Sequence, residues 1–210
     1  MKTRAAPTRA ELLRARKLLE RVERGAELLR KKREALVRTL VPLARPAAEA
    51  RRAIAQTAAA AYRAELDALA VHGAGGVAAT GWPPRALEVE LDVQRMWGVA
   101  VPVLRDLPEC ERDLAARATA PGPTGPAVFE AANRFEALLA ELLQAVAREA
   151  RVRAVGAALA RASRQLHTLE QRVAPELTAQ IVATAHALDE RDREDQTRLR
   201  NLRRKTAGAR

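Results

Sequence analysis

Two long stretches of this 210-residue chain carry apolar residues at alternating steps of three and four. Such a 3.5-residue repeat lies along one side of an α-helix, and when sustained it is typical of a left-handed coiled coil. The first row comprises Leu12, Ala15, Leu19, Val22, Ala26, Leu29, Leu36, Leu40, Leu43, Ala47, Ala50, Ile54, Ala61, Ala64 and Ala68. Sixty helical residues span about 90 Å, so this row needs a second helix beside it.

The C-terminal stretch supplies the matching row. It comprises Val128, Ala131, Phe135, Leu138, Leu142 and Ala145, then Val152, Val155, Leu159, Ala162, Leu166, Leu169 and Val173, and more weakly Leu177, Ile181, Thr184 and Leu188. The phase slips near Glu149, which predicts a local change in supercoiling rather than a break. We expect one helix over about 127–205, antiparallel to the first.

The middle of the chain has a different pattern. Gly73–Gly76, Trp82-Pro83-Pro84 and the cluster Pro121–Pro126 cannot continue a helix. Between them, alternating apolar residues on both sides of Met96-Trp97-Gly98 predict a short β-hairpin. These residues are Leu87, Val89, Leu91 and Val93, then Val99, Val101 and Val103. A lone hairpin is marginal in water, so we expect it to pack on the coil or on a partner.

The predicted fold is therefore all-α: a long antiparallel two-helix coiled coil with a small central segment containing the hairpin. Residues 1–70 form the first helix, 71–126 the central segment and 127–210 the second helix. Thr8 with Glu11 makes a capping box at the first helix start. Pro42 and Pro46 lie inside that helix and predict a bend or a broken turn around Arg38–Pro46, since each removes a backbone hydrogen bond.

Composition supports an extended rather than compact structure, because only five residues are aromatic and 30% are charged. The net charge of +11 divides into +9 for residues 1–70, −2 for 71–126 and +4 for 127–210. The basic helices could attract nucleic acid, anionic lipid or an acidic protein surface. Cys110 is the single cysteine, which favours a reducing compartment. No apolar run long enough to span a membrane and no secretory h-region occur, so we expect a soluble chain.

Specific chemistry is weakly indicated. Gly73–Ala78 fits a degenerate dinucleotide fingerprint, but an Ala-rich helix precedes it where a strand is required. No P-loop motif occurs. His167 and Glu170 are three residues apart, but without a Glu-x-x-His pair they read as exposed helix positions. Cys110 lacks a recognisable base and is expected to be inert. We predict no catalytic residues, no metal and no cofactor.

Several short motifs resemble the D subunit of the V-type and A-type rotary ATPases, in the same order along the chain. They are Pro7-Thr8-Arg9-x-x-Leu12, Gly25, Leu28-Leu29-Arg30-Lys31-Lys32-Arg33-x-x-Leu36, Trp97-Gly98-Val99 with Pro102, Leu169-Glu170 followed by Pro175, and Glu190-Arg191-x-x-Glu194-x-x-x-Arg198-Leu199-Arg200. Each motif is weak by itself, and together they cover nearly the whole chain.

This resemblance implies a non-catalytic central rotor shaft that transmits torque between an ATP-hydrolysing or ATP-synthesising ring and a membrane ring that moves protons or sodium ions. The implied partners are the catalytic A and non-catalytic B subunits, the F subunit of the stalk and a funnel-shaped subunit that couples the shaft to the membrane ring. The implied location is cytoplasmic and peripheral to the membrane, with no direct membrane insertion.

Two sets of residues are candidates for partner contacts. The first set, expected at the end that enters the ring, consists of Arg9, Arg14, Arg16, Lys17, Arg200, Arg203 and Arg204. The second set lies in the Ala-rich part of the first row, where small residues bury little area by themselves, and is expected to contact the F subunit. It consists of Ala47, Ala50, Ile54 and Ala61.

Two other classes of function remain compatible with parts of the pattern. A coiled-coil scaffold unrelated to rotary motors would also have the apolar rows. A basic nucleic-acid-binding protein would also have the charge, and Arg30-Lys31-Lys32-Arg33 is the natural patch for it. The chain lacks the aromatic residues on which bases stack, so we expect no nucleic acid among the partners.

Overall fold

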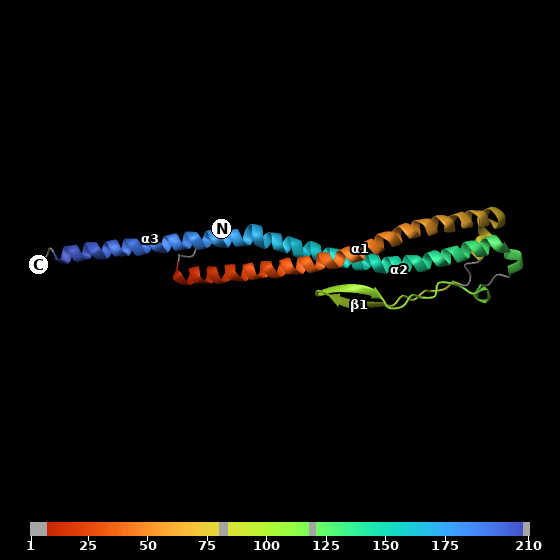
Figure 1. Ribbon diagram of the computed structural model, residues 1–210, viewed down its shortest axis with the longest axis horizontal. Helices are drawn as coiled ribbons and strands as arrows, with labels where there is room; N and C mark the ends of the chain where they lie inside the picture. Colours follow the sequence, from red (N-terminus) through yellow and green to blue (C-terminus); the bar gives the residue numbers. More distant parts are fainter. Residues whose placement is uncertain (1–7, 80–83, 118–120, 208–210) are drawn as a thin grey trace. The chain divides into compact units, whose positions relative to one another are not determined.

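The structure is a computed structural model, and it describes residues 8–79, 84–117 and 121–207. Along the chain lie α1 (Arg9–Ala79), β1 (Leu91–Met96), β2 (Val99–Leu104), the 3₁₀-helix η1 (Leu114–Ala116), α2 (Pro121–Thr168), the π-helix η2 (Leu169–Val173) and α3 (Ala174–Ala207) (Figure 1). The contacts divide the chain into two compact units. Unit 1 contains residues 1–34 and 160–210, and unit 2 contains residues 35–159.

In unit 1, the first part of α1 pairs antiparallel with the end of α2, η2 and α3. Two ion pairs join the helices: Arg9 to Asp192 at 2.9 Å, and Arg30 to Glu170, with Nε and Oε1 2.8 Å apart. Thr8 caps the start of α1, because the Glu11 amide donates to Thr8 Oγ1 at 3.2 Å, and this bond is one half of the predicted capping box. Ala15 and Ala26 on α1 and Ala162 and Leu166 on α2 form the buried row between the helices.

In unit 2, the rest of α1 packs on α2. Leu36, Ala47, Ala61 and Ala68 on α1 and Val128, Ala131, Leu138, Ala145 and Val155 on α2 are buried. Tyr62 and Phe135 meet edge to face with ring centroids 5.5 Å apart. The predicted pair of long helices is confirmed, and each residue predicted for the first row is buried or half-buried. In the second row, Leu142 is exposed instead.

Pro42 and Pro46 do not break α1. The backbone stays helical through both prolines, and the residue of α1 with non-helical angles is Gly73. The predicted broken turn around residues 38–46 is therefore wrong, while a bend there stays a prediction. Proline is compatible with a helix where neighbouring packing holds the chain, and Leu36 and Ala47 are buried on either side.

Two glycines mark the ends of the paired helices in unit 2. Gly73 (φ 65°) and Gly125 (φ 68°) adopt left-handed backbone angles that other residues rarely take. Helix nevertheless continues to Ala79 on one side, and a helical turn precedes Gly125 on the other. The predicted interruptions of the helix are therefore confirmed at Gly73 and Gly125, although each is shorter than the clusters Gly73–Gly76 and Pro121–Pro126. Trp82 and Pro83 lie outside the described residues.

The predicted hairpin is confirmed. β1 and β2 pair antiparallel from Leu91 opposite Leu104 to Met96 opposite Val99, and Trp97-Gly98 forms the turn. Both turn residues have positive φ (53° and 74°), as in a type I′ turn. Val99 and Val101 on β2 are buried, whereas Leu91 and Val93 on β1 are exposed.

The hairpin contacts α1, which confirms the expectation that it packs on the coil. The indole Nε1 of Trp97 donates a hydrogen bond to Thr39 Oγ1 on α1 at 3.2 Å, and that hydroxyl donates to the carbonyl of Ala35. The Trp97 backbone is strained, because a bulky residue with positive φ is disfavoured. The hydrogen bond to α1 offsets part of that cost.

The predicted single helix over 127–205 is interrupted. After Thr168 the chain forms one π-helical turn, η2, before α3 begins. Glu149, where the sequence predicted a change in supercoiling without a break, lies in a helical part of α2 and is half-buried, and the change in supercoiling stays a prediction.

Candidate functional site

No catalytic arrangement is visible in the described ranges. They contain no group of three or more His, Cys, Asp or Glu side chains placed to hold a metal ion. The Cys110 thiol is buried and donates to the carbonyl of Pro108 at 3.4 Å. Gly73–Ala78 lies within α1 rather than after a strand, so it does not have the context of a dinucleotide site. Among the described helices, none has the length and apolar character needed to cross a lipid bilayer.

The first candidate set is exposed and lies in unit 1. Arg9, Arg14, Arg16 and Lys17 follow the start of α1, and Arg200, Arg203 and Arg204 lie near the end of α3. The structure does not bring the two groups together. Arg9 contacts α3 at Asp192, and Arg200 is eight residues further along that helix, about 12 Å away at 1.5 Å per residue.

Around those C-terminal arginines, α3 is exposed on all sides. Every residue from Asp189 to Arg204 is exposed, including Leu199 and Leu202. The ion pair with Arg9 lies at Asp192, and further along α3 the Arg198–Glu194 ion pair links successive turns of the helix itself. The described part of the chain therefore leaves this segment uncovered.

The second candidate set lies in unit 2 and is largely covered by the chain itself. Ala47 and Ala61 are buried against α2, whereas Ala50 and Ile54 are half-buried. The small side chains therefore serve the pairing of α1 with α2 first. A partner could reach only Ala50 and Ile54 among the four.

A second row of apolar residues, which the sequence interpretation missed, runs along α1 beside the buried row. We call it the outer row: Val41, Ala48, Ala55, Ala59, Tyr62 and Leu66, all exposed. Tyr62 and Leu66 are 58% and 65% exposed, which is high for large apolar side chains. Steps of three, four and seven relate its members, so the signal was present in the sequence. Arg45 and Arg52 interrupt the row and make it basic.

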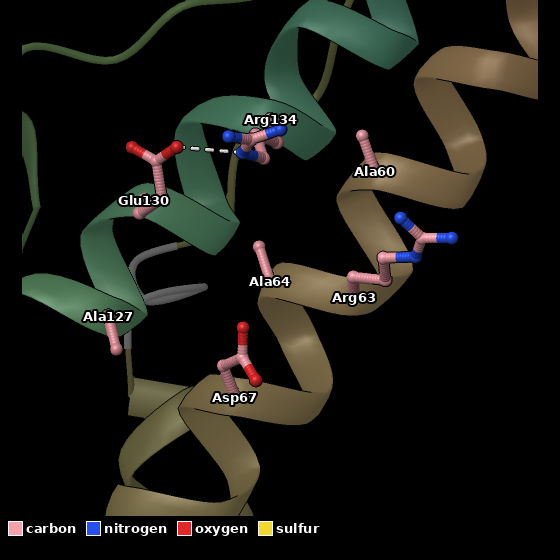
Figure 2. Close-up of a pocket in the computed structure, with 7 residues that line it drawn as sticks. All are labelled: Ala60, Arg63, Ala64, Asp67, Ala127, Glu130 and Arg134. Carbon is pink, nitrogen blue, oxygen red and sulfur yellow. Dashed lines mark hydrogen bonds and ion pairs between the residues drawn. The ribbon is translucent and has the colours of Figure 1, made fainter.

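Shallow grooves flank the helix pair of unit 2. Figure 2 shows the residues that line one of them: Ala60, Arg63, Ala64 and Asp67 from α1, and Ala127 with the Glu130–Arg134 ion pair from α2. A second groove is lined by Ala47, Ala48, Arg51, Arg52, Glu149, Val152 and Arg153. Arg51 and Glu149 form an ion pair at 2.8 Å across it. Both grooves are lined by small apolar and charged side chains, which suits protein contact better than a small ligand.

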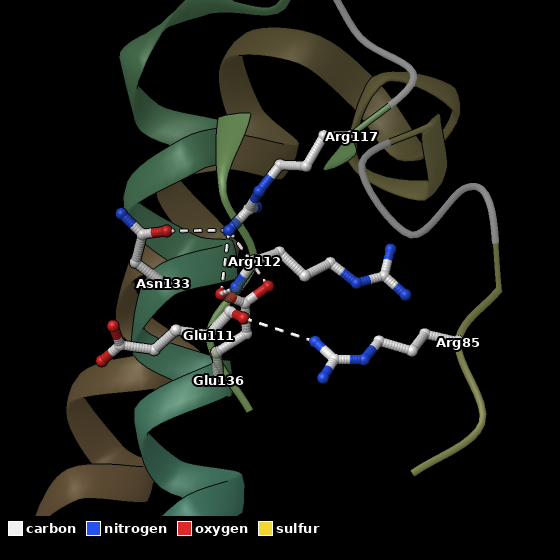
Figure 3. A network of polar contacts seen from close by, with 6 residues as sticks. All are labelled: Arg85, Glu111, Arg112, Arg117, Asn133 and Glu136. Atoms are coloured by element: carbon white, nitrogen blue, oxygen red, sulfur yellow. Dashed lines mark hydrogen bonds and ion pairs between the residues drawn. The ribbon is translucent and has the colours of Figure 1, made fainter. Parts of the chain in front are cut away.

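A buried arginine, Arg117, ties the connector between β2 and α2 (residues 105–117) to α2 (Figure 3). The Arg117 side chain is 1% exposed, and its Nη2 donates to Asn133 Oδ1 at 2.9 Å and to both carboxylate oxygens of Glu136. Glu136 also accepts the amide of Arg112 at 3.0 Å, and the guanidinium lies 5.8 Å from the Phe129 ring centre. The sequence did not point to Arg117, because its contacts are with residues of another element.

Comparison with known proteins agrees with these features. The family model for the D subunit of ATP synthase matches residues 11–204. The D subunit of the V-type ATP synthase of Thermus thermophilus is 36% identical over 205 residues, covering 96% of this chain and 88% of that protein. The corresponding protein of Anaeromyxobacter dehalogenans is 36% identical over 202 residues, covering 96% of both. The D subunit of the A-type ATP synthase of Pyrococcus horikoshii is 28% identical over 201 residues, covering 94% of this chain and 92% of that protein.

The matched region includes both paired helices, the hairpin and the exposed C-terminal turns of α3. The chain therefore belongs to the family of ATP synthase D subunits, which includes those of the V-type and A-type ATP synthases.

Proposed function

We propose that this protein is the central rotor shaft of its rotary ATPase and transmits torque between the nucleotide-handling ring and the ion-translocating ring of the membrane. The observation that carries the proposal is that the apolar rows are buried or half-buried along each unit, with Leu142 as the exposed exception, and that ion pairs join the helices at Arg30–Glu170 and Arg51–Glu149. Interlocked side chains oppose sliding and rotation of one helix on the other, so a pair resists twisting better than a single helix.

We further propose that the exposed basic set contacts the catalytic A and non-catalytic B subunits. A turning shaft can change an equilibrium at a catalytic site only if its contacts favour one state of that site over another. The arginines of the first set lie at different heights along unit 1, so they could meet acidic side chains of the ring unequally. Nothing in this role requires a catalytic group on the chain itself.

For the F subunit of the stalk, we propose a contact beside the Ala-rich stretch, through Ala50, Ile54 and the outer row. The exposed Tyr62 and Leu66 supply apolar area that the chain does not cover itself. Arg45 and Arg52 would favour an acidic partner surface. A funnel-shaped subunit would link the shaft to the membrane ring, and the protein would be held peripherally on the cytoplasmic side of the membrane through these partners.

Rotation itself is the decisive test. In the assembled complex fixed by its catalytic ring, a probe is attached to an exposed cysteine introduced as Glu109→Cys, with the buried Cys110 changed to Ser. We expect the probe to turn in steps on addition of ATP. A probe that stays fixed while the complex hydrolyses ATP would refute the shaft.

The partner surfaces are tested separately by matched substitutions. Arg14→Gln with Arg16→Gln should lower torque without lowering assembly. The exposed pair Arg161→Gln with Arg164→Gln serves as the control.

Tyr62→Ser with Leu66→Ser should weaken retention of the F subunit at least about tenfold, the effect of losing roughly 1.4 kcal/mol of apolar contact. Leu28→Ser, which changes a side chain that is 68% exposed elsewhere on α1, should leave that retention unchanged. Equal retention of the F subunit by all these variants would place its contact elsewhere.

A further inference from the structure

The apolar row of the second helix contains one residue too many for a regular coiled coil. From Leu166 to Leu188 the chain advances 22 residues, where three heptads advance 21. Up to Val173 the steps alternate between three and four, and from Leu177 onward they alternate again. Between Leu169 and Ile181, three successive steps of four occur. In a continuous α-helix, the residues after this point would be turned by about 100° away from α1, the rotation of one residue.

The backbone departs from α-helical geometry at the same place. In η2 (Leu169–Val173) the amide of Ala174 donates to the carbonyl of Leu169, five residues back instead of four. Such a π-turn holds one residue more than an α-turn. It therefore absorbs the extra residue, and both sections of the row stay in contact with α1: Leu166 and Leu169 before the turn, and Leu177, Ile181 and Leu188 after it, are buried or half-buried.

Side chains on both sides confine the turn to this position. If the extra residue moved towards the C-terminus, Glu176 and Gln180 would replace Leu177 and Ile181 against α1. If it moved towards the N-terminus, Ser163 and His167 would replace Ala162 and Leu166. Glu176, Gln180 and His167 are exposed in the structure. Either movement would bury polar groups in place of apolar ones, which is unfavourable.

Proline by itself does not explain the turn. Pro175 follows η2 and would clash with the carbonyl of Gln171 in a regular helix, so it favours the wider turn. Pro42 and Pro46, however, lie within α1 without any π-turn. A π-turn forms near Pro175 and not near Pro42 or Pro46 because the apolar row has an extra residue there. Pro175 then adds to the preference for the wider turn.

A cross-helix contact holds the turn on α1. Arg30 donates through Nε and Nη2 to the same oxygen of Glu170, the second residue of η2, and Glu27 approaches the other side of the guanidinium at 3.3 Å. The Glu170 side chain is 31% exposed, and the paired carboxylate raises the pKa of Arg30. Gly25 on α1 lies opposite the start of η2, and a Cβ at that position would be 3.9 Å from Leu169 Cδ1, an ordinary contact distance.

From these observations we propose that η2 is a register joint: it stores one residue, sets the rotation of α3 about its own axis, and is clamped to α1 by Arg30 acting as a positioning residue. The joint determines which side chains of α3 face α1 and which face outward as far as the exposed end of the helix. This holds whether or not the protein transmits torque, so the test can use the full chain without its partners.

The test removes the stored residue. In a Pro175→Ala background, deletion of the exposed Gln171 should convert the turn to α-helix while Leu177, Ile181 and Leu188 stay on α1. We expect the melting temperature to change by less than about 3 °C. Deletion of the exposed Arg21 from α1, in the same background, has no π-turn to absorb it and should lower the melting temperature by at least about 10 °C. Similar losses for the two deletions would overturn the register joint.

The clamp has its own readout. Arg30→Met should accelerate hydrogen exchange of the amides at 169–174 at least about tenfold, while amides at 155–166 keep their rates. Arg30→Lys, which keeps the charge, should restore part of the protection. Unchanged exchange at 169–174 in Arg30→Met, or equal acceleration in both regions, would show that Arg30 does not clamp the turn.

Discussion

The buried ion pair between Arg117 and Glu136 allows a sharp stability prediction. Replacing Glu136 with Gln keeps the shape of the side chain and removes its charge. The Arg117 guanidinium, 1% exposed, would then be a buried cation without that counter-charge, and arginine does not escape by losing its proton. Breaking one side of a buried pair costs about 3–5 kcal/mol.

Part of that cost has a specific structural origin. Nε and Nη1 of Arg117 are buried, and the described residues offer them no hydrogen-bond acceptor. Nη2 makes the contacts to Glu136 and Asn133, so the carboxylate is the main compensation for the whole group. Arg117→Met leaves Glu136 with the Arg112 amide as a donor, so we expect a smaller loss of about 1–3 kcal/mol.

Urea unfolding followed by circular dichroism measures these losses. Glu136→Gln should lower the midpoint by on the order of 1–5 M, since the free energy of unfolding falls by about 1–3 kcal/mol per molar urea. The double variant with Arg117→Met removes both charges and should be more stable than Glu136→Gln alone. Glu130→Gln at the exposed Glu130–Arg134 pair is the control and should cost less than about 0.5 kcal/mol. A loss below about 1 kcal/mol for Glu136→Gln would refute the reasoning, and so would losses that simply add in the double variant.

Four other substitutions test the packing and the backbone. Leu36→Ala, at a fully buried position, should cost about 3–5 kcal/mol in thermal or urea unfolding, and a loss under about 1 kcal/mol would mean that Leu36 is not in the core. Gly25→Ala should stabilise α1 by roughly 0.5–1 kcal/mol, because the new methyl meets only Leu169 at contact distance. Gly125→Ala should instead destabilise the protein, since the φ of Gly125 is 68° and the new methyl would clash with the His72 ring. Trp97→Phe should remove the hydrogen bond to Thr39 and speed hydrogen exchange in β1 and β2, with a loss of about 0.5–1.5 kcal/mol; unchanged exchange would show that the indole does not hold the hairpin.

The helix pair could be predicted well from the sequence, because a 3.5-residue row is a local signal repeated many times. Leu142 is the exception in the second row, and it is 37% exposed, at the edge of the buried strip. The hairpin was also predictable, since Gly98 occupies a turn position and the valines of β2 alternate. In each case, residues close in the chain determine the geometry.

Features that depend on distant residues were not predicted. Arg117 becomes buried only because the connector returns along α2 to Asn133 and Glu136. The helical path through Pro42 and Pro46 depends on packing that local propensity does not contain. The π-turn lies between these two cases. Its signal, three consecutive steps of four, was present in the sequence but was interpreted only as a weakening of the apolar row. The candidate contact sets depend on partners, so the structure gives their exposure and leaves their role as a proposal.

The hairpin of β1 and β2 has one more consequence, for the chain before it meets its partners. A two-stranded sheet has two open edges, each able to recruit a strand from another copy and begin aggregation. On β2, Pro102 stands opposite Val93 and has no amide to offer an incoming strand. On β1, the Val93 amide is already taken by the Asp92 carboxylate at 2.7 Å, and Arg95 adds a charge to the same strand. Newly made copies can therefore accumulate while awaiting assembly without joining through this sheet.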